Sequence, residues 1–215
     1  MVIKVCGMRE AENIRGVEAL GIDMMGFIFW PKSKRYVSRK PAYLPHHVKR
    51  VGVFVDEDIE QVRRIVDDYA LGFIQLHGTE SPDYIRQLRA AVCGGASWGG
   101  VGLIKAFNIS TAEDLEATKR YEGLADYFLF DTKGKSVGGN GEKFDWTVLT
   151  SYEGETPFLL SGGIGPDDAE TLHAQWSMFH SKCIGIDLNS RFELAPALKD
   201  VTALARFLHE INNVQ

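Results

Sequence analysis

The sequence predicts an α/β fold, a single-domain (β/α)8 barrel, and three observations lead to this prediction. Short runs of β-branched and aromatic residues alternate with longer segments in which apolar residues recur at helical intervals. The alternation has eight units, and 215 residues shared among eight units leave about 27 residues each, close to the size of a βα repeat. No linker divides the chain. We therefore expect one TIM barrel domain over residues 1–215.

The predicted strands are short and apolar, as in a sheet that is covered on both faces. In chain order they are Val2–Cys6, Met24–Phe29, Arg50–Val55, Phe73–Leu76, Gly102–Phe107, Tyr127–Phe130, Phe158–Leu160 and Cys183–Leu188. A doubly wound open sheet has the same alternation and stays the alternative fold.

Segments with helical spacing separate these strands. They are predicted over Glu10–Leu20, Gln61–Tyr69, the stretch from Pro82 with Ser81 as N-cap, the stretch from Thr111 as cap to Tyr121, and about Ala197 to Ile211. We count roughly eight helices, and we expect His46 and His47 to be exposed residues of one of them. The Gly- and Ser-rich stretch Cys93–Gly102 is predicted to be a loop.

Composition excludes several classes of protein. Lys and Arg number 24 against 29 Asp and Glu, a net charge of −5, which argues against a nucleic-acid partner. No run approaches ~18 apolar residues, and the first ten residues lack the apolar core of a signal peptide, so we expect a cytoplasmic protein that does not bind membranes. The three cysteines, Cys6, Cys93 and Cys183, suit neither a disulfide framework nor a zinc site.

Five ionisable residues lie in or at the ends of apolar strands, where a charge is expensive: Lys4, Cys6, Lys105, Asp131 and Asp187. Charged side chains on a barrel strand point into the barrel or its mouth, where they can pair. For the two lysines, an internal salt-bridge network without chemistry is as good an interpretation as a catalytic role.

Cys6 and Asp131 end their strands on the face where barrel enzymes carry their active sites. A thiolate beside a cation can act as a base, and a buried carboxyl group can act as an acid. Together they could form a general acid/base pair. The alternative for Cys6 is a small buried apolar residue.

Two glycine-rich or small-residue loops predict a phosphate site. The loop with Gly162 and Gly163 follows the seventh strand, and Asn189 and Ser190 follow Asp187 at the eighth. These are the loops in which phosphate-binding barrels present backbone N–H groups to an anion. The nucleotide-binding motifs GxxxxGK[ST] and GxGxxG are absent from the sequence.

One arginine and one histidine are further candidates. Arg35 lies in a basic, aromatic loop after the second strand, and its planar guanidinium suits a carboxylate, although a solvated basic loop is the alternative. The six histidines show no metal-ligand spacing, and His77 alone ends a strand near the predicted mouth.

Seven segments in order and at the right spacing make this chain resemble the phosphoribosylanthranilate isomerase family. They are Lys4–Met8, Gly26–Phe29 with Pro31–Val37, Gly52–Val55, Gln75–Gly78, Leu129–Lys133, Phe144–Trp146 and Leu160–Gly163. The resemblance covers nearly the whole chain. It implies a (β/α)8 barrel that performs an Amadori rearrangement of N-(5-phosphoribosyl)anthranilate in tryptophan biosynthesis, without metal or organic cofactor.

The resemblance also implies roles for individual residues. Cys6 matches the general base and Asp131 the general acid of the family, and Arg35 matches the arginine that holds the anthranilate carboxylate. Gly162 and Gly163 match the phosphate loop, and Asp187 the aspartate that ends the eighth strand. The expected partner is a small phosphorylated substrate, and the chain is expected to be a monomer or a homodimer.

The sequence departs from the family after the eighth strand, where Ser-Ser-Gly-Val-Glu is common and Asn189-Ser190-Arg191-Phe192-Glu193 stands here. We expect Arg191 to turn outward toward Glu193; a contact with the phosphate is the alternative. Two other functions compete with the isomerase: another phosphate-binding barrel enzyme, and a catalytically silent barrel that serves as a binding subunit.

Overall fold

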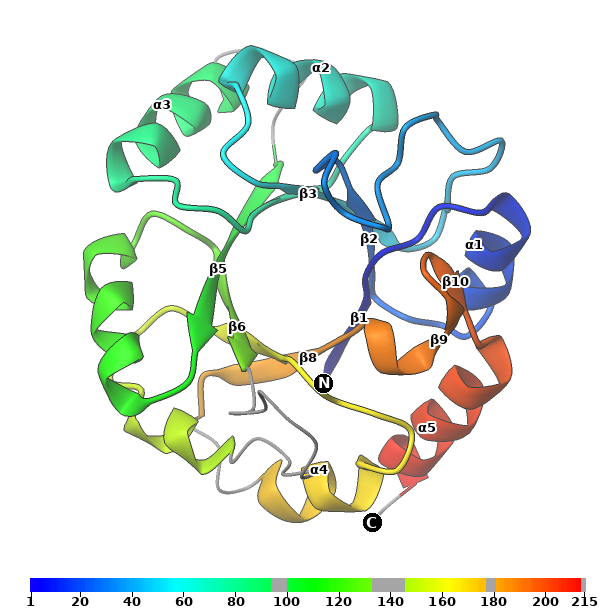
Figure 1. The fold of residues 1–215 in the computed structure, drawn as a ribbon. Helices are drawn as coiled ribbons and strands as arrows, with labels where there is room; N and C mark the ends of the chain where they lie inside the picture. Colours follow the sequence, from blue (N-terminus) through cyan, green and yellow to red (C-terminus); the bar gives the residue numbers. More distant parts are fainter. Residues whose placement is uncertain (94–99, 133–145, 177–180, 214–215) are drawn as a thin grey trace.

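The structure is a computed structural model that describes residues 1–93, 100–132, 146–176 and 181–213. Eight parallel strands form a closed barrel in the order of the sequence, and helices surround it (Figure 1). The predicted barrel is therefore confirmed, and the doubly wound alternative is wrong.

The barrel strands follow the predicted positions within two residues at each end. They are β1 (Val2–Val5), β2 (Met24–Ile28), β3 (Lys49–Phe54), β4 (Phe73–Leu76), β5 (Gly102–Ile109), β6 (Tyr127–Thr132), β7 (Phe158–Ser161) and β8 (Cys183–Leu188). Pairing of Val5 with Leu188 between β1 and β8 closes the barrel.

The helical elements are α1 (Ala11–Glu18), α2 (Ile59–Tyr69), α3 (Pro82–Cys93), η1 (Ala112–Tyr121), η2 (Trp146–Ser151), α4 (Ala169–Trp176), η3 (Ser190–Phe192) and α5 (Val201–Asn213), where η marks a 3-10 helix. Ser81 caps α3 as predicted, because its Oγ accepts the backbone N–H of Tyr84 at 3.1 Å. Thr111 and Asp114 form a reciprocal capping box at η1.

Two predictions about helices are wrong. Residues 29–48 are all described, and they contain no helix between β2 and β3. His46 and His47 are exposed, but they lie in a bend whose backbone N–H groups both donate to the Glu18 carboxylate of α1. The segment is held by these bonds, so it needs no helical hydrogen bonds of its own.

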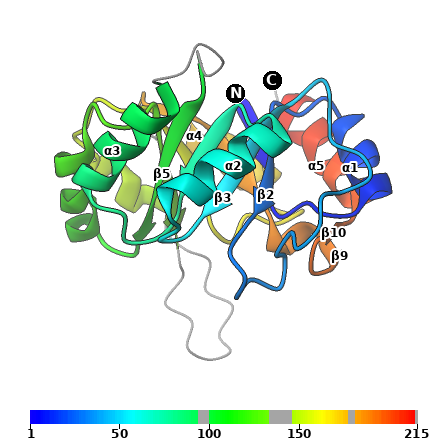
Figure 2. The same ribbon diagram turned by 90° about the horizontal axis from the view of Figure 1, so that it is seen from above.

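The last helix also begins later than predicted, at Val201. The residues before it form a short antiparallel hairpin of β9 (Glu193–Ala195) and β10 (Leu198–Lys199), with Ala197 at a positive φ of 67°. Figure 2 shows this hairpin toward the opposite end of the barrel from the start of the chain. Most of the predicted loop 93–102 lies outside the described residues.

The core has two parts. The larger one lies between the strands and the helices and includes Val5, Phe54, Phe128 and Phe207. The smaller one fills the barrel interior with Met24, Val51, Ile104, Ala106, Leu129 and Leu159. The barrel is thus a packed core with polar groups above it at the carboxyl ends of the strands. No helix in the described ranges is long and apolar enough to cross a membrane.

Candidate active site

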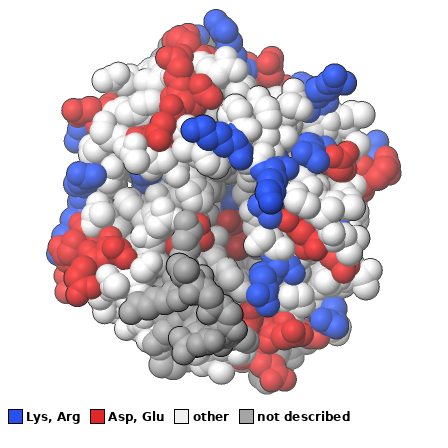
Figure 3. Space-filling model, viewed as in Figure 1, with Lys and Arg blue, Asp and Glu red and all other residues white. Residues whose placement is uncertain are grey.

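A cavity of about 510 Å³ opens at the carboxyl ends of the barrel strands. All eight residues that the sequence proposed for the site line it: Cys6, Arg35, Asp131, Gly162, Gly163, Asp187, Asn189 and Ser190. On the face with the loops that follow the strands, basic side chains lie beside the centre, toward β1 and β2 (Figure 3). The barrel thus brings residues from both ends of the chain into one cavity.

Cys6 and Lys4 lie next to each other at the end of β1. Lys4 is fully buried, and its Nζ donates to Asp187 Oδ1 at 2.7 Å. Burial opposes the charge of Lys4, but Asp187 and Cys6 outweigh that effect and raise the pKa of Lys4. Burial raises the pKa of the Cys6 thiol, and the Lys4 ammonium counters this shift by favouring the thiolate.

A row of polar residues crosses four neighbouring strands at one level. Lys4 pairs with Asp187, Asp187 with Ser161, and Ser161 with Asp131 in the register of the sheet. The Ser161 hydroxyl donates to Asp187 Oδ2 at 3.2 Å. Side chains at one level of a barrel point to the same side, so this row joins the surroundings of the thiol to those of Asp131.

Asp131 faces an imidazole. His77 Nε2 lies 3.6 Å from Asp131 Oδ2, and the Gln75 amide nitrogen donates to His77 Nδ1 at 3.2 Å. Because Nδ1 accepts this bond, the Nε2 of a neutral His77 carries the proton and faces the carboxylate. The Gln75 Oε1 is buried and makes no hydrogen bond within the described chain, and Gln75 lines the cavity.

Arg35 is held by a carboxylate of the hairpin after β8. Its Nε and Nη2 donate to the two oxygens of Glu193 at 2.8 and 2.6 Å. This hydrogen bonding raises the pKa of Arg35. The prediction that Arg191 turns toward Glu193 is wrong, because Glu193 is occupied by Arg35 and Lys199. Arg191 is exposed and lines the cavity beside Gly165 instead.

The two glycines of the predicted phosphate loop differ in their surroundings. Gly162 has a φ of 95°, and a Cβ there would lie 2.0 Å from the carbonyl oxygen of Thr132, so only glycine fits. Gly163 has a φ of 70°, and a Cβ there would meet no heavy atom within 4 Å. The backbone at Gly163 is therefore open to a ligand.

Lys105 does not reach the cavity. Its Nζ donates to Glu80 Oε2 at 3.0 Å and to the carbonyl oxygen of Gly78 at 2.8 Å. Glu80 also accepts the backbone N–H groups of Asp56 and Gly78. Of the two interpretations that the sequence left open for Lys105, the structure favours the internal salt bridge, which ties the loop after β4 to β5.

The sequence pattern singled out neither Gln75 nor Glu193 nor Lys199 for the site. His77 was placed near the mouth but given no role. Gln75 stands between buried apolar residues of a strand, as Lys4 does, and this signal could have found it although its amide does not ionise. Glu193 and Lys199 belong to the hairpin that the sequence did not predict.

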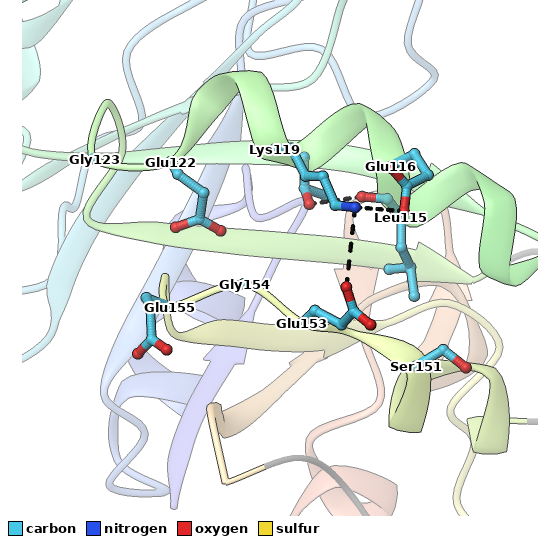
Figure 4. A pocket seen from close by; sticks show the side chains of 10 residues that line it. Leu115, Glu116, Lys119, Glu122, Gly123, Ser151, Glu153, Gly154 and Glu155 are labelled. Carbon is cyan, nitrogen blue, oxygen red and sulfur yellow. Dashed lines mark hydrogen bonds and ion pairs between the residues drawn. The ribbon is translucent and has the colours of Figure 1, made fainter.

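A second hollow, of about 470 Å³, lies between η1 and residues 151–155 (Figure 4). Glu116, Glu122, Glu153 and Glu155 line it, which disfavours a phosphorylated ligand. Lys119 bonds Glu116 at 2.8 Å and lies 3.9 Å from Glu153, and Glu122 accepts hydrogen bonds from Tyr152 and Thr156. Among the described residues, no group of three or more His, Cys, Asp or Glu could hold a metal ion.

Comparison with known proteins adds an independent line of evidence. The family model of N-(5'-phosphoribosyl)anthranilate isomerase matches residues 3–210. A protein of that name from Phocaeicola vulgatus is 49% identical over 215 residues, covering 98% of each chain. Its counterpart from Parabacteroides distasonis is 48% identical over 217 residues, covering 98% of this chain and 93% of its own.

Solved structures agree with the sequence relatives. Phosphoribosylanthranilate isomerase from Thermotoga maritima superposes with a TM-score of 0.81 at 31% identity, covering both chains completely. A phosphoribosylanthranilate isomerase in complex with reduced 1-(o-carboxyphenylamino)-1-deoxyribulose 5-phosphate gives a TM-score of 0.80 at 28% identity, again over both whole chains. With its closed barrel and its matching sequence, the chain belongs to the N-(5'-phosphoribosyl)anthranilate isomerase family.

Proposed function

We propose that Cys6 and Asp131 catalyse, as general base and general acid, the isomerisation of N-(5'-phosphoribosyl)anthranilate to 1-(2-carboxyphenylamino)-1-deoxyribulose 5-phosphate. As a member of this family the chain is an isomerase of tryptophan biosynthesis. The observation that carries the proposed roles is that Cys6, Asp131, Arg35 and the Gly162–Gly163 loop line one cavity. That cavity therefore offers a base, an acid and two kinds of anion contact together.

The reaction begins with proton donation. Protonated Asp131 gives its proton to the furanose ring oxygen, the bond between C1′ and that oxygen breaks, and the nitrogen lone pair forms a Schiff base. His77, whose Nε2 lies 3.6 Å from Asp131 Oδ2, keeps the carboxyl group oriented toward the cavity. The Gln75 bond to Nδ1 holds the imidazole in turn.

The second step is proton abstraction. The Cys6 thiolate takes the proton from C2′, and the electrons of that bond form a C1′–C2′ double bond while the Schiff base nitrogen becomes an amine. The resulting enolamine tautomerises to the ketone. Lys4 supports this step because its ammonium favours the thiolate against the effect of burial.

The two anionic ends of the substrate have separate partners. Arg35 binds the anthranilate carboxylate, and backbone N–H groups near Gly163 together with Asn189 and Ser190 bind the phosphate. The related isomerase with a bound phosphorylated product analogue supports a phosphorylated small molecule as the ligand.

Three further features belong to this proposal. Residues 1–215 form one domain, the protein acts in the cytoplasm, and it works as a monomer or a homodimer. The family model spans residues 3–210, which supports a single domain. Light scattering after gel filtration distinguishes the two oligomeric states, and a trimer or tetramer would contradict both.

The test is turnover of freshly made N-(5'-phosphoribosyl)anthranilate, followed by the loss of its fluorescence. The native chain should convert it, while Cys6→Ala and Asp131→Asn should fold and yet lose turnover. A native chain that binds the substrate without converting it would support a silent barrel. Near-normal turnover in either variant would remove that residue from the mechanism.

A further inference from the structure

A network of charged side chains stands behind the arginine of the cavity. Arg35 donates twice to Glu193, and the ammonium of Lys199 donates to Glu193 Oε1 at 2.6 Å and to Asn189 Oδ1 at 2.8 Å. The groups surround Gly7, where a Cβ would lie 2.6 Å from Arg35 Cδ and 2.8 Å from Asn189 Oδ1. Gly7 has a φ of 79° and directly follows Cys6, so the network packs against the end of β1.

The charges of this network are buried. The side chain of Lys199 is 0% exposed and that of Glu193 is 6% exposed, whereas the side chain of Arg35, which lines the cavity, is 23% exposed. Burial opposes the charge of Glu193, but hydrogen bonds from Arg35 and Lys199 outweigh it and lower the carboxyl pKa. Glu193 is thus a carboxylate that depends on both cations.

The backbone of Lys199 is fixed as firmly as its side chain. The Asn13 amide of α1 donates to the Lys199 carbonyl oxygen at 2.8 Å, and the Lys199 N–H donates to Asn13 Oδ1 at 2.7 Å. The N–H of Ala197, at the turn of the hairpin, donates to Glu193 at 3.2 Å. These bonds hold Glu193 and Lys199 of the β9–β10 hairpin in place beside Arg35.

This arrangement leaves a defined part of Arg35 for a ligand. Glu193 occupies the edge formed by Nε and Nη2, while Nη1 makes no hydrogen bond within the described chain. One carboxylate between two cations leaves the group with a net charge of +1. Without Lys199, Glu193 would cancel the charge of Arg35, and an anionic ligand would meet a neutral ion pair.

We propose that Glu193 and Lys199 are positioning residues for the carboxylate of the substrate: Glu193 aims the free end of Arg35 into the cavity, and Lys199 offsets the charge of Glu193 so that Arg35 still attracts an anion. This inference rests on the proposed function, because it takes a carboxylated aromatic amine as the ligand. Neither residue lines the cavity, so each acts through Arg35.

The test compares two ligands that differ by one carboxyl group. The first is reduced 1-(o-carboxyphenylamino)-1-deoxyribulose 5-phosphate, and the second is the same compound without its carboxyl group. Calorimetry gives the dissociation constant of each for the native chain, Glu193→Gln, Lys199→Met and the double variant. Glu60→Gln is the matched control, because Glu60 pairs with Arg63 on the exposed surface of α2.

We expect Lys199→Met to weaken binding of the carboxylated ligand on the order of tenfold to a hundredfold and to leave the second ligand within about twofold, since only the first ligand uses Arg35. Glu193→Gln should lose on the order of tenfold, because an amide holds the guanidinium less firmly. The double variant should bind the carboxylated ligand better than Lys199→Met and about as well as Glu193→Gln, because it restores the net charge but not the carboxylate that holds Arg35. Glu60→Gln should match the native chain.

Equal losses for both ligands, or no recovery in the double variant, would make the network a mere support of the hairpin and overturn the inference. Circular dichroism and melting temperature confirm that each variant is folded; if Lys199→Met does not fold, Glu193→Gln alone decides by its ratio between the two ligands. A native chain that does not turn over the substrate would contradict the proposed function instead. The two failures are therefore distinguishable.

Discussion

Two strands of the barrel each carry a buried lysine paired with a buried carboxylate, and the two pairs contact different groups. Lys4 on β1 bonds Asp187 at 2.7 Å, and Lys105 on β5 bonds Glu80 at 3.0 Å. Asp187 lines the cavity, and Lys4 lies beside the Cys6 thiol. Glu80 instead accepts backbone N–H groups of two loops.

The neighbours of a buried ion pair therefore decide its role. Lys105 and Glu80 supply hydrogen-bond partners for backbone groups of the loop after β4, which otherwise have no partner in the described chain. Lys4 and Asp187 have the Cys6 thiol, the proposed general base, as their third neighbour, so their charges act on that thiol. We therefore expect the Lys105–Glu80 pair to affect stability and the Lys4–Asp187 pair to affect the chemistry.

The largest expected effect concerns the chemistry at Lys4. Cys6→Ala should lower kcat by about 10³, the range of a lost general base. Lys4→Met should lower kcat by roughly 10² in the native background, because it removes the cation that favours the thiolate. In the Cys6→Ala background, Lys4→Met should change the residual rate little, since no thiolate is left to stabilise. Steady-state kinetics of the four proteins measure this cycle.

The cycle has its own control in Lys105→Met, which should leave kcat per folded molecule within about twofold in both backgrounds. Independent losses from Lys4→Met and Cys6→Ala would contradict the link between the lysine and the thiol.

The next largest effect concerns stability. Lys105→Met leaves Glu80 buried with an uncompensated charge and should lower the free energy of unfolding by about 3–5 kcal/mol. Glu80→Gln combined with Lys105→Met should recover much of this loss, because the amide keeps an acceptor for the loop N–H groups. Urea unfolding measures both values. A stability close to that of the native chain in the single variant would mean that the pair contributes nothing to the fold.

The sequence proposed Cys6, Asp131 and Asp187 as site residues because a polar residue at the end of an apolar strand is costly to bury. The structure places all three at one cavity, since the carboxyl ends of the barrel strands meet there. The role of Lys105 stayed open because its partner Glu80 lies in a loop, and no periodicity predicts where a loop side chain points.

The hairpin after β8 could not be predicted for a related reason. Glu193–Ala195 and Leu198–Lys199 are too short to show a strand pattern, and their pairing depends on contacts with Asn13 and Arg35 from distant segments. The segment between β2 and β3 was assigned helical residues, but Glu18 of α1 supplies its hydrogen bonds. In both places tertiary contacts override local preference.

A smaller effect separates the two free thiols of the described chain. Burial raises the pKa of Cys6 and raises that of Cys183 to about 12, and Lys4 opposes the shift at Cys6 alone. The pKa of a thiol in the unfolded chain is about 8.5. A thiol whose pKa is higher in the folded chain contributes stability that is fully present below pH 8.5 and is lost as the pH rises from there toward the pKa of the folded chain. For Cys183 this loss amounts to roughly 1 kcal/mol per pH unit.

Cys183→Ala should therefore lose less stability between pH 8 and pH 10 than the native chain does, and urea unfolding at the two pH values measures the difference. The same slope in both proteins would show that Cys183 titrates normally. In the native chain, iodoacetamide should react with Cys6 at a lower pH than with Cys183, because only Cys6 has a cation beside it.

The smallest effect concerns an exposed cation, Arg191, which stands where the family commonly has glycine. Arg191 lines the cavity beside Gly165, and solvent screens its charge, unlike that of Lys4. An exposed charge contributes roughly 0.2–1 kcal/mol to such a contact, so Arg191→Ala should raise KM by at most about fivefold and leave kcat unchanged. The rise should shrink in 0.5 M salt, and Arg63→Ala on α2 is the control. An unchanged KM would mean that the backbone near Gly163 binds the phosphate unaided, whereas a hundredfold rise would make Arg191 a principal ligand despite its exposure.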